Sequence, residues 1–363
     1  MRGQVRFPAR AEIVPGELVV RVHFHEHDTA LGRERCWSFV SEGLWARRQK
    51  EIILTLKVEP GENPEDFPRE AFFFYERMYE LAASGRAVDA GGHTDFGETG
   101  FLGRRAVAYT EAYTAAYPAP HSHSLSAILL TEGEFAAYQA IGLSRIRALL
   151  GKAYSHFPSP PWSDRRRPSV VTKDALKTSL LARASILNAG GAVASCEKGV
   201  LTLRLPQSAR TRLASALETL GDDSVFAILT DIDPAADSCL VWTPGEARPN
   251  TISRPNARPS RVAGCFLAAV PGGRPAGDRS QFVEDGFLLS LSAVSYRALR
   301  EALKRGSALV LPASPDSFRL EWAPGLSVER VVRIPARKPE SEPIPLEAMT
   351  RKRASGRGAA ALE

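Results

Sequence analysis

Residues 36–103 decide how this chain folds: they open with CWSFVSEGLWARRQKEIILTL and close with GGHTDFGETGFLG. Within them, residues 51–58 (EIILTLKV) crowd apolar side chains together, which predicts a strand covered on both faces. Residues 68–83 begin with proline and repeat apolar side chains every three or four positions, which predicts a helix. Its expected buried face consists of Phe72, Tyr75, Met78, Tyr79 and Ala82. The stretch holds no obvious catalytic group, so it indicates a surface for recognition.

Further elements extend this first half in both directions. Residues 18–24 (LVVRVHF) alternate apolar and polar side chains, and residues 124–131 (SLSAILLT) form an apolar run, so both predict strands. Residues 143–154 (LSRIRALLGKAY) predict a helix with one apolar side. Residues 158–168 (PSPPWSDRRRP) are rich in proline and charge, which indicates a stiff linker and a unit boundary within them.

The second half contains an internal repeat of strand, helix, strand and strand. The first copy spans residues 199–205 (GVLTLRL), 209–220, 225–230 (VFAILT) and a segment that ends in Trp-x-Pro-Gly at Trp242. The second copy spans residues 286–291 (GFLLSL), 295–305, 308–311 and a segment that ends in the same signature at Trp322. Each copy alone has too little core, so the two copies are expected to pack together.

These elements predict an α+β protein made of two packed mixed α/β units, the second with the strand–helix–strand–strand repeat, plus a disordered basic tail. The predicted division is an N-terminal extension at residues 1–17, a first unit at 18–165, a second unit at 166–334 and the tail at 335–363. The tail reads PARKPESEPIP and then RKRASGRGAAA, without the apolar periodicity that a packed element needs.

The composition is that of a globular chain of 363 residues, 44% of them hydrophobic and 24% charged. The net charge is +6, and much of the excess lies in short basic runs at residues 47–48, 104–105, 165–167 and 351–353. Short runs without a nucleic-acid-binding fingerprint are typical of solvated loops, which disfavours a nucleic-acid partner. Arginine outnumbers lysine and alanine is abundant, which indicates a GC-rich, bacterial genome.

The cysteines and the apolar runs indicate a reducing compartment. Cys36, Cys196, Cys239 and Cys265 form no CxxC pair, and the last two lie in apolar runs, which predicts buried reduced thiols. The first seventeen residues lack the apolar core of a signal peptide, and no run approaches the ~18 apolar residues of a membrane helix. The sequence therefore predicts a cytoplasmic protein without membrane insertion.

His23, His25 and His27 alternate along an expected strand, so their side chains share one face and could converge on a metal ion. The competing interpretation is an exposed polar edge, because Glu26 and Asp28 lie between and beside them. The sequence favours the second interpretation and predicts no metal and no cofactor. It contains no P-loop, no GxSxG and no HExxH motif.

Several short motifs follow one another in a defined order. In the first half these are Trp37-Ser38-Phe39, Glu42-Gly43, Gln49 with Glu51-Ile52, Gly92-His93, Phe96 and Phe101-Leu102-Gly103. Farther on they are Val262-Ala263-Gly264-Cys265-Phe266 and Val283-Glu284-Asp285-Gly286. Together they resemble the C-terminal domain of the SARA/endofin proteins. The chain shows neither a zinc-binding FYVE module nor a Smad-binding segment, so the resemblance implies neither membrane targeting nor Smad signalling.

The first half is also similar to the suppressor-of-fused fold. The similarity rests on the EIILTL strand, the FYERMYELA helix, Leu129-Leu130-Thr131 and Pro161-Trp162. Both families are known as protein-binding modules, and bacterial suppressor-of-fused-like domains are often linked to toxin immunity. Both resemblances imply a non-catalytic protein.

We therefore expect a non-catalytic, cytoplasmic interaction module or adaptor that binds a protein partner through loops of the first unit. The candidate contact residues are Trp37, Glu42, Gly43, Trp45, His93, Phe96, Phe101 and Gly103. Trp37, Trp45 and Phe101 would be aromatic anchors, although Trp37 and Phe101 also fit core positions. Two alternatives stay open: an immunity protein that neutralises a cognate toxin, and a metal protein or enzyme that uses His23, His25 and His27.

Overall fold

The computed structural model describes residues 7–29, 32–112, 124–244, 246, 248–272, 277–323 and 343–344. They form two compact units. Unit 1 contains the described residues up to Thr131, Pro161–Arg167 and the pair Pro343–Ile344; unit 2 contains Glu132–Pro160 and the described residues from Pro168 to Ala323. Both units combine helices with a sheet, which confirms the predicted α+β class with two mixed units. Among the described residues, no helix is long and apolar enough to cross a membrane.

The chain passes between the units at positions other than the predicted boundary near residue 165. Residues 132–160, which the sequence placed in the first unit, belong to unit 2, and Pro161–Arg167 return to unit 1. In this return, the backbone nitrogen of Lys57 donates to the carbonyl of Ser163 at 3.0 Å, and Ser163 donates to Thr55 at 2.8 Å. Prolines prevent a long ladder but allow such local pairing. The stretch that resembles a linker is thus an integral part of unit 1.

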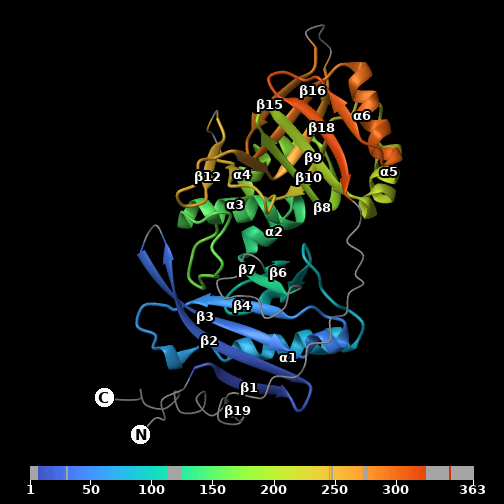
Figure 1. The fold of residues 1–363 in the computed structure, drawn as a ribbon. Coiled ribbons are helices and arrows are strands. Elements are labelled where there is room, and N and C mark those ends of the chain that lie inside the picture. Colours follow the sequence, from blue (N-terminus) through green and yellow to red (C-terminus); the bar gives the residue numbers. More distant parts are fainter. Residues whose placement is uncertain are drawn as a thin grey trace. The chain divides into compact units, whose positions relative to one another are not determined.

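Unit 1 is built on an eight-stranded sheet with the order β19-β1-β2-β3-β4-β7-β6-β5 (Figure 1). Its strands are β1 (Ala9–Val14), β2 (Leu18–Thr29), β3 (Gly32–Glu42), β4 (Ile52–Lys57), β5 (His93–Asp95), β6 (Ala106–Glu111), β7 (Leu125–Leu130) and β19 (Pro343–Ile344). Every second side chain of β2 is buried from Leu18 to Val22, and β4 is buried on both faces, as their sequence patterns predict. β1 and β19 lie in the predicted extension and tail; the rest of that tail lies outside the described residues.

Helix α1 (Glu70–Ala83) packs its apolar side against this sheet. Of the predicted face, Phe72, Tyr75, Met78 and Ala82 are buried. The Tyr75 hydroxyl donates to the carbonyl of Phe39 at 2.6 Å and accepts from the backbone nitrogen of Leu54 at 3.2 Å. One phenol therefore joins α1 to both β3 and β4. Among the described residues of the unit there are also the short 3-10 helices η1 (Leu44–Arg47), η2 (Pro64–Asp66) and η3 (Gly97–Thr99).

Unit 2 contains strands whose pairings close into a ring. The ring strands are β8 (Ser185–Glu197), β9 (Val200–Pro206), β10 (Phe226–Asp231), β14 (Phe266–Pro271), β15 (Arg279–Val283), β16 (Gly286–Leu291), β17 (Leu309–Leu311) and β18 (Ser317–Ala323). The ladder runs β18-β9-β8-β10-β14-β16-β15. β17 pairs with β18, and Ser314, just after β17, pairs with Arg279 of β15, which completes the ring. Strands β11 (Ser238–Val241), β12 (Asn250–Ser253) and β13 (Arg261–Gly264) extend from β8.

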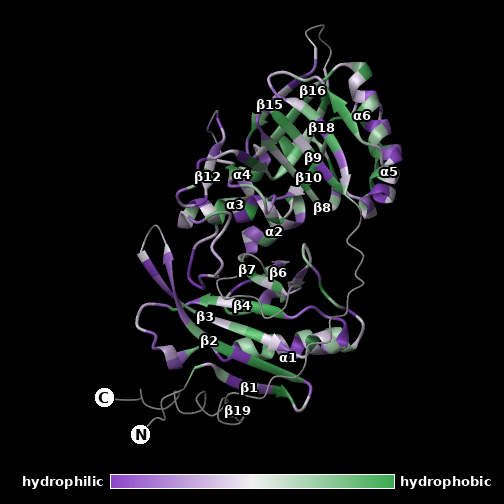
Figure 2. Ribbon diagram, viewed as in Figure 1, coloured by the Kyte–Doolittle hydropathy of each residue, from purple (hydrophilic) through white to green (hydrophobic). Residues whose placement is uncertain are grey.

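The helices of unit 2 are α2 (Glu132–Ile141), α3 (Leu143–Tyr154), α4 (Lys173–Lys177), α5 (Arg210–Thr219) and α6 (Ala293–Arg305), with the 3-10 helices η5 (Leu180–Arg183) and η6 (Gln207–Ala209). Ser292 caps the start of α6, since its hydroxyl accepts from the backbone nitrogen of Ser295. α5 and α6 pack against each other and share one core with the ring strands. Figure 2 shows hydrophobic residues concentrated in the strands, whereas α5 and α6 also carry many hydrophilic ones.

The repeat predicted from the sequence is present, but its last strand has a different equivalent. β9, α5 and β10 correspond to β16, α6 and β17 in order. β10 pairs antiparallel with β14, as β17 does with β18, whereas β11 pairs with β12 and β13. β14 is thus the strand of the first copy that corresponds to β18 in the second copy. The Trp-x-Pro-Gly signature at Trp242 follows β11, whereas the one at Trp322 lies in β18. The two signatures therefore do not occupy equivalent positions, because strands are equivalent when they pair in the same way.

A buried ion cluster lies inside unit 2. Arg145 of α3, 1% exposed at its side chain, donates from Nε to Asp285 at 2.7 Å and from Nη2 to Glu284 at 2.7 Å. Its Nη1 donates to Ser179 at 2.8 Å, and its guanidinium lies 4.4 Å from the centre of the Trp242 ring. The cluster is stable only while each charged group has its partner, because a buried charge without a partner costs several kcal/mol of folding free energy. It connects α3 to the turn between β15 and β16.

The four cysteines are buried and free, as the sequence predicts for Cys239 and Cys265. Burial raises the pKa of the Cys36, Cys196 and Cys239 thiols to about 12 and that of Cys265 well above its usual value. These thiols are therefore protonated at neutral pH and act as packing residues.

Candidate functional site

The first predicted contact loop is a rigid turn at the end of β3. Glu51, 3% exposed, accepts from the hydroxyl of Ser41 at 2.6 Å and from the backbone nitrogens of Gly43 at 2.9 Å and Trp45 at 3.1 Å. Gly43 has φ 124°, and a Cβ there would lie 1.9 Å from the carbonyl oxygen of Glu17, so only glycine fits. Glu42 forms an ion pair with Arg21 at 2.7 Å. Gly43 thus shapes the turn, and its role in contact stays a prediction.

The aromatic residues of this loop have opposite environments. Trp37 is completely buried in the core of unit 1, and its Nε1 donates to the carbonyl of Pro64 at 2.9 Å. It therefore fills the core position that the sequence left open, and it cannot contact a partner of the folded unit. Trp45 in η1 is 46% exposed, which leaves a large apolar surface in solvent. Of the two tryptophans, only Trp45 stays a contact candidate.

The second predicted loop surrounds η3. His93 is exposed in β5, where it pairs with Ala108. The carboxylate of Asp95 accepts from Arg105 Nε at 2.8 Å and from the backbone nitrogen of Gly97 at 2.8 Å, and these bonds lower its pKa. Phe101 and Arg104 exchange two backbone hydrogen bonds at 2.7 and 2.9 Å. The turn is therefore fixed by its own polar contacts.

Phe101 belongs to the core of unit 1 at 8% exposure, the alternative that the sequence left open. Its ring stacks on Phe74 of α1 with the centroids 5.3 Å apart, and on Phe96 with the centroids 5.1 Å apart. Phe96 is half-buried at the outer end of this stack. The stack anchors the turn to the first two turns of α1.

A groove of about 670 Å³ lies between this turn and the start of α1. Phe73, Phe74, Phe96, Phe101 and Leu102 form its apolar lining, and Gly103 lies at its border. Phe73 is 54% exposed, more than any other aromatic side chain in the described part of the chain. The groove has the size and apolar lining of a binding site for a small group or a short peptide segment.

Two arginines border the groove on one side. Arg166 is 71% exposed at its side chain, and its Nε lies 3.8 Å from Glu59 Oε2. Arg165 is bound to Glu62 and lies over the Trp37 ring at 5.7 Å, so it is fixed in place. The pKa of Glu59 is raised, mainly because burial disfavours its charged form. The border therefore presents one largely solvated guanidinium, which favours an acidic group on a ligand.

The predicted contact residues do not form one continuous surface. Phe96, Phe101 and Gly103 border the groove, whereas Glu42, Gly43 and Trp45 do not line it. β3 and β5 stand four positions apart in the sheet order, which corresponds to ~19 Å at the usual strand spacing. Trp45 and the groove are thus separate candidates.

The sequence analysis missed Phe73 and the two arginines. The run Phe72-Phe73-Phe74 is itself a signal, because successive residues of a helix differ by ~100° and three adjacent side chains cannot all face one sheet. Phe72 and Phe74 are buried, so Phe73 is left in solvent. Arg165 and Arg166 could not be assigned to this site from sequence, because their segment resembles a linker.

The histidine row of β2 is tied to unit 1 by other contacts. Nε2 of His25 lies 2.9 Å from the hydroxyl of Ser38, which in turn lies 2.7 Å from that of Thr55. The His27 ring meets the edge of Trp162 with the centroids 5.3 Å apart. Burial lowers the pKa of His23 to about 4 and also lowers that of His25. Within the described residues, no group of three or more His, Cys, Asp or Glu side chains could hold a metal ion.

Comparisons with known proteins cover most of the chain. The family model described as "Smad anchor for receptor activation-like, C-terminal" matches residues 119–317. The chain is 25% identical over 289 residues to human "Zinc finger FYVE domain-containing protein 9", a match that covers 74% of this chain and 20% of that protein. It is 23% identical over 317 residues to mouse "Zinc finger FYVE domain-containing protein 16", covering 82% of this chain and 20% of that protein. The chain thus spans about a fifth of the length of these relatives.

Among solved structures, the crystal structure of Drosophila Suppressor of Fused matches with 9% identity and a TM-score of 0.35. The match covers 84% of this chain and 91% of that one.

Proposed function

Because this chain belongs to the Smad anchor for receptor activation-like, C-terminal family, we propose that it is a non-catalytic protein-interaction module whose groove in unit 1 binds a short segment of a partner protein. The family description names an anchor, which supports a binding role. The groove itself supports the same role, since its chemically active side chains are limited to the carboxylate of Glu70, the hydroxyl of Thr99 and two arginines.

The observation that carries the proposal is Phe73. A phenylalanine that is 54% exposed beside a preformed apolar groove contributes little to folding, and exposed aromatic side chains in such places are typical binding anchors. The turn bonded through Asp95 and the Phe74–Phe101–Phe96 stack hold the groove open before a ligand arrives. A rigid site loses little conformational entropy on binding.

The occupant that fits is a peptide segment with apolar side chains and one acidic residue. The apolar side chains would cover Phe73 and Phe96, and the acidic residue would pair with the solvated guanidinium of Arg166. A charge-assisted pair at the rim adds orientation and specificity to the apolar contact.

The test is a selection of random short peptides displayed on phage against the full chain, followed by affinity measurements. We expect selected peptides that combine apolar and acidic residues. Phe73→Asp should weaken them about 30-fold, the effect of a binding hot spot of ~2 kcal/mol. Arg166→Gln should weaken them less and remove the preference for the acidic residue.

Trp45→Asp is the matched control, because Trp45 is also an exposed aromatic of unit 1 but lies outside the groove. It should leave affinity unchanged. If Trp45→Asp abolishes binding and Phe73→Asp does not, the contact surface is the turn after β3 and the groove is not the site. If selection returns no specific peptide at all, the interaction role of the groove is refuted.

A further inference from the structure

A second hollow lies on the outer wall of unit 2, across strands β13, β8, β9 and β18. Its volume is about 330 Å³. The strand register explains why it forms: Thr202 faces Ser195 on one side and Arg319 on the other, with Val200 and Arg204 two positions along its own strand. Small side chains thus lie at the centre of a ring of long ones. The long side chains rise around the small ones and leave a depression.

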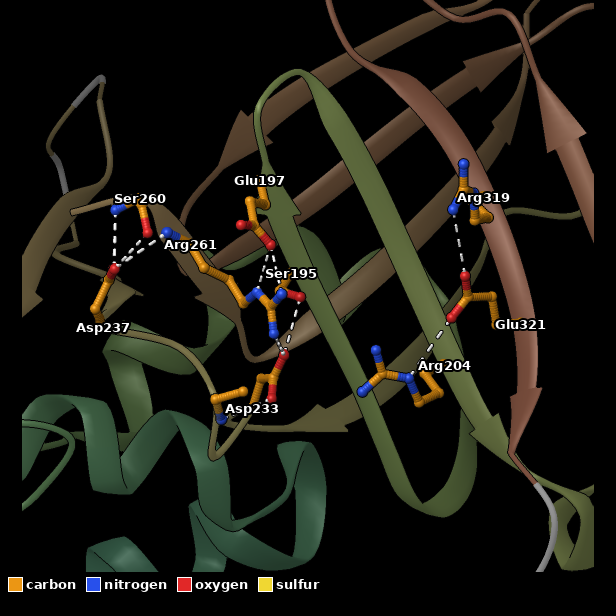
Figure 3. A network of polar contacts seen from close by, with 10 residues as sticks. Ser195, Glu197, Arg204, Asp233, Asp237, Ser260, Arg261, Arg319 and Glu321 are labelled. Carbon is orange, nitrogen blue, oxygen red and sulfur yellow. Dashed lines mark hydrogen bonds and ion pairs between the residues drawn. The ribbon is translucent and has the colours of Figure 1, made fainter.

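The charges around this hollow are predominantly positive. Lys198, Arg204 and Arg319 line it with one carboxylate, that of Glu321, an excess of two positive charges, whereas the fourth cation, Arg261, is offset by Glu197 and Asp233. Figure 3 shows Arg204 and Arg319 on neighbouring strands on either side of Glu321, and Arg261 held by Glu197 and Asp233. A dianion would balance this excess.

The cations differ in how far their hydrogen-bond donors are used. Arg261 is occupied, since its Nε donates to Glu197 at 2.8 Å and its Nη1 lies 3.9 Å from Asp233. Arg204 Nε is 3.7 Å and Arg319 Nη1 is 3.6 Å from Glu321, both beyond hydrogen-bond distance. Apart from these ion pairs, neither guanidinium donates a hydrogen bond within the described residues, and neither does the hydroxyl of Thr202. Two open guanidiniums and one open hydroxyl therefore border the same hollow.

We propose that this hollow binds a phosphate monoester carried by a phosphorylated side chain of a partner protein. A phosphate monoester has a charge of about −2 and three acceptor oxygens, which match the positive excess and the three open donors. Arginine is the side chain best suited to such a group, because its planar donors bind two oxygens at once. The site is separate from the groove of unit 1 and does not depend on it.

The surroundings favour a single phosphate over an anionic membrane. Polybasic membrane sites present clusters of about four to eight cations without interspersed acids. Here Glu197, Glu321 and Asp233 lie among the arginines, so a flat anionic surface would meet them as well. One discrete phosphate can enter the centre and avoid them.

The test uses the full chain and three degenerate peptide libraries that carry phosphoserine, serine or glutamate at one fixed position. Fluorescence polarisation should show binding of the phosphoserine library only, weakened by added salt. Arg204→Gln with Arg319→Gln should reduce affinity at least tenfold, and Thr202→Val, which keeps the shape but removes the hydroxyl, should reduce it severalfold. Arg297→Gln, on an exposed position of α6, is the matched control and should have no effect.

Glu321→Gln provides a variant that damage to the fold cannot imitate. It removes the one carboxylate between the two open guanidiniums, so phosphoserine peptides should bind it about threefold to tenfold more tightly. An unchanged or weaker affinity of Glu321→Gln would count against the site.

The other probes separate the sources of the same chemistry. Equal binding of the glutamate library would show an acidic segment as the ligand and overturn the phosphate. Inorganic phosphate bound as tightly as the peptides would show a free-phosphate site. Phosphatidylserine vesicles that bind through the same arginines, while phosphopeptides do not, would show a membrane contact. Each of these three results would refute the proposal as stated.

Discussion

Unit 1 and unit 2 differ in whether the edge strands of their sheets pair with another strand. Unit 1 is an open sheet with one helix on its face, so surfaces remain at the sheet ends and at the ends of α1. Unit 2 closes most of its pairings into a ring, so among its described strands the open edge lies in the extension β13-β11-β12. The open unit carries an apolar groove at the start of α1, and the closed unit carries a charged hollow on its wall. The architecture thus decides which chemistry each unit can offer to a partner.

The units also differ in what secures their helices. α3 of unit 2 is held by a buried ion cluster, whereas α1 of unit 1 is held by the neutral hydroxyl of Tyr75 and by apolar packing. Breaking a buried charge pair costs more than removing a neutral hydrogen bond. The two units should therefore respond to equivalent lesions with different magnitudes.

The largest effect is expected for Asp285→Ala. The change leaves the Arg145 guanidinium buried without the carboxylate that binds two of its nitrogens, so unit 2 should lose ~3–5 kcal/mol of unfolding free energy. Urea denaturation followed by Trp242 fluorescence measures the loss. Glu301→Ala is the control, since Glu301 is 52% exposed and its pairs with Lys304 and Arg305 lie at the surface. A loss below ~1 kcal/mol for Asp285→Ala would mean that the cluster does not hold α3.

A smaller effect is expected for Tyr75→Phe in unit 1. The change keeps the ring but leaves the backbone nitrogen of Leu54 and the carbonyl of Phe39 without this partner, which should cost ~1–3 kcal/mol. The same denaturation, followed by Trp37 fluorescence, reports on unit 1. Tyr79→Phe serves for comparison, because the Tyr79 hydroxyl binds Glu17 and Arg47 at an exposed site. Equal losses in the two variants would argue against a lock formed by Tyr75.

Lowering the pH should reduce the unfolding free energy of unit 1 by as much as Tyr75→Phe does, or by less. The pKa of His23 is lowered to about 4, chiefly by burial, whereas an unfolded chain keeps it near its usual 6.5. Between pH 6.5 and about 4, His23 is protonated in the unfolded state but neutral in the folded state. The unfolding free energy of unit 1 therefore falls as the pH drops through this range. Because the side chain is only half-buried, we expect ~1–2 kcal/mol. His23→Gln should flatten the pH dependence and His93→Gln should not; an unchanged slope in His23→Gln would assign it to other groups.

The smallest effect on stability is expected for Phe73→Ser. An exposed side chain contributes little to the core, so the unfolding free energy should change by no more than ~0.5 kcal/mol. Thermal denaturation of Phe73→Ser beside Phe72→Ser, a change in the core, measures the contrast. If Phe73→Ser destabilises the chain as much as Phe72→Ser does, Phe73 is a folding residue and its exposure has no functional meaning.

Local patterns predicted the elements that depend on neighbours in sequence. The EIILTL run is the buried strand β4, the predicted face of α1 is buried at four of its five positions, and the repeated strand–helix–strand order is present in unit 2. These features follow from the periodicity of one strand or one helix. The resemblance to the SARA/endofin domain supplied the family, which the match over residues 119–317 bears out.

Contacts between distant residues lay beyond such patterns. Arg145 and Asp285 are 140 residues apart, and no local pattern indicated that α3 packs near the β15–β16 turn. The prolines around Trp162 indicated a linker, because proline content reports on local stiffness and not on the pairing of Ser163 with β4. For the candidate site, the sequence named the glycine-rich turn as a contact loop; the structure places Phe96, Phe101 and Gly103 of this turn at the groove, and their role in contact stays a prediction. The other residues of the groove, which lie on α1 and at Arg165 and Arg166, could not be placed beside this turn from the sequence.

In the ring of unit 2, the strands of the two repeat copies pair with each other in a reciprocal way. β14, from the first copy of the repeat, pairs parallel with β16 of the second, and β18, from the second copy, pairs parallel with β9 of the first. Exchanging the two copies leaves this pattern unchanged, which is the property of a twofold symmetric dimer. A polypeptide with a single copy would present open strand edges and would need a second molecule to cover them. Unit 2 contains both halves of such a pattern in one polypeptide, so its ring closes without a second molecule.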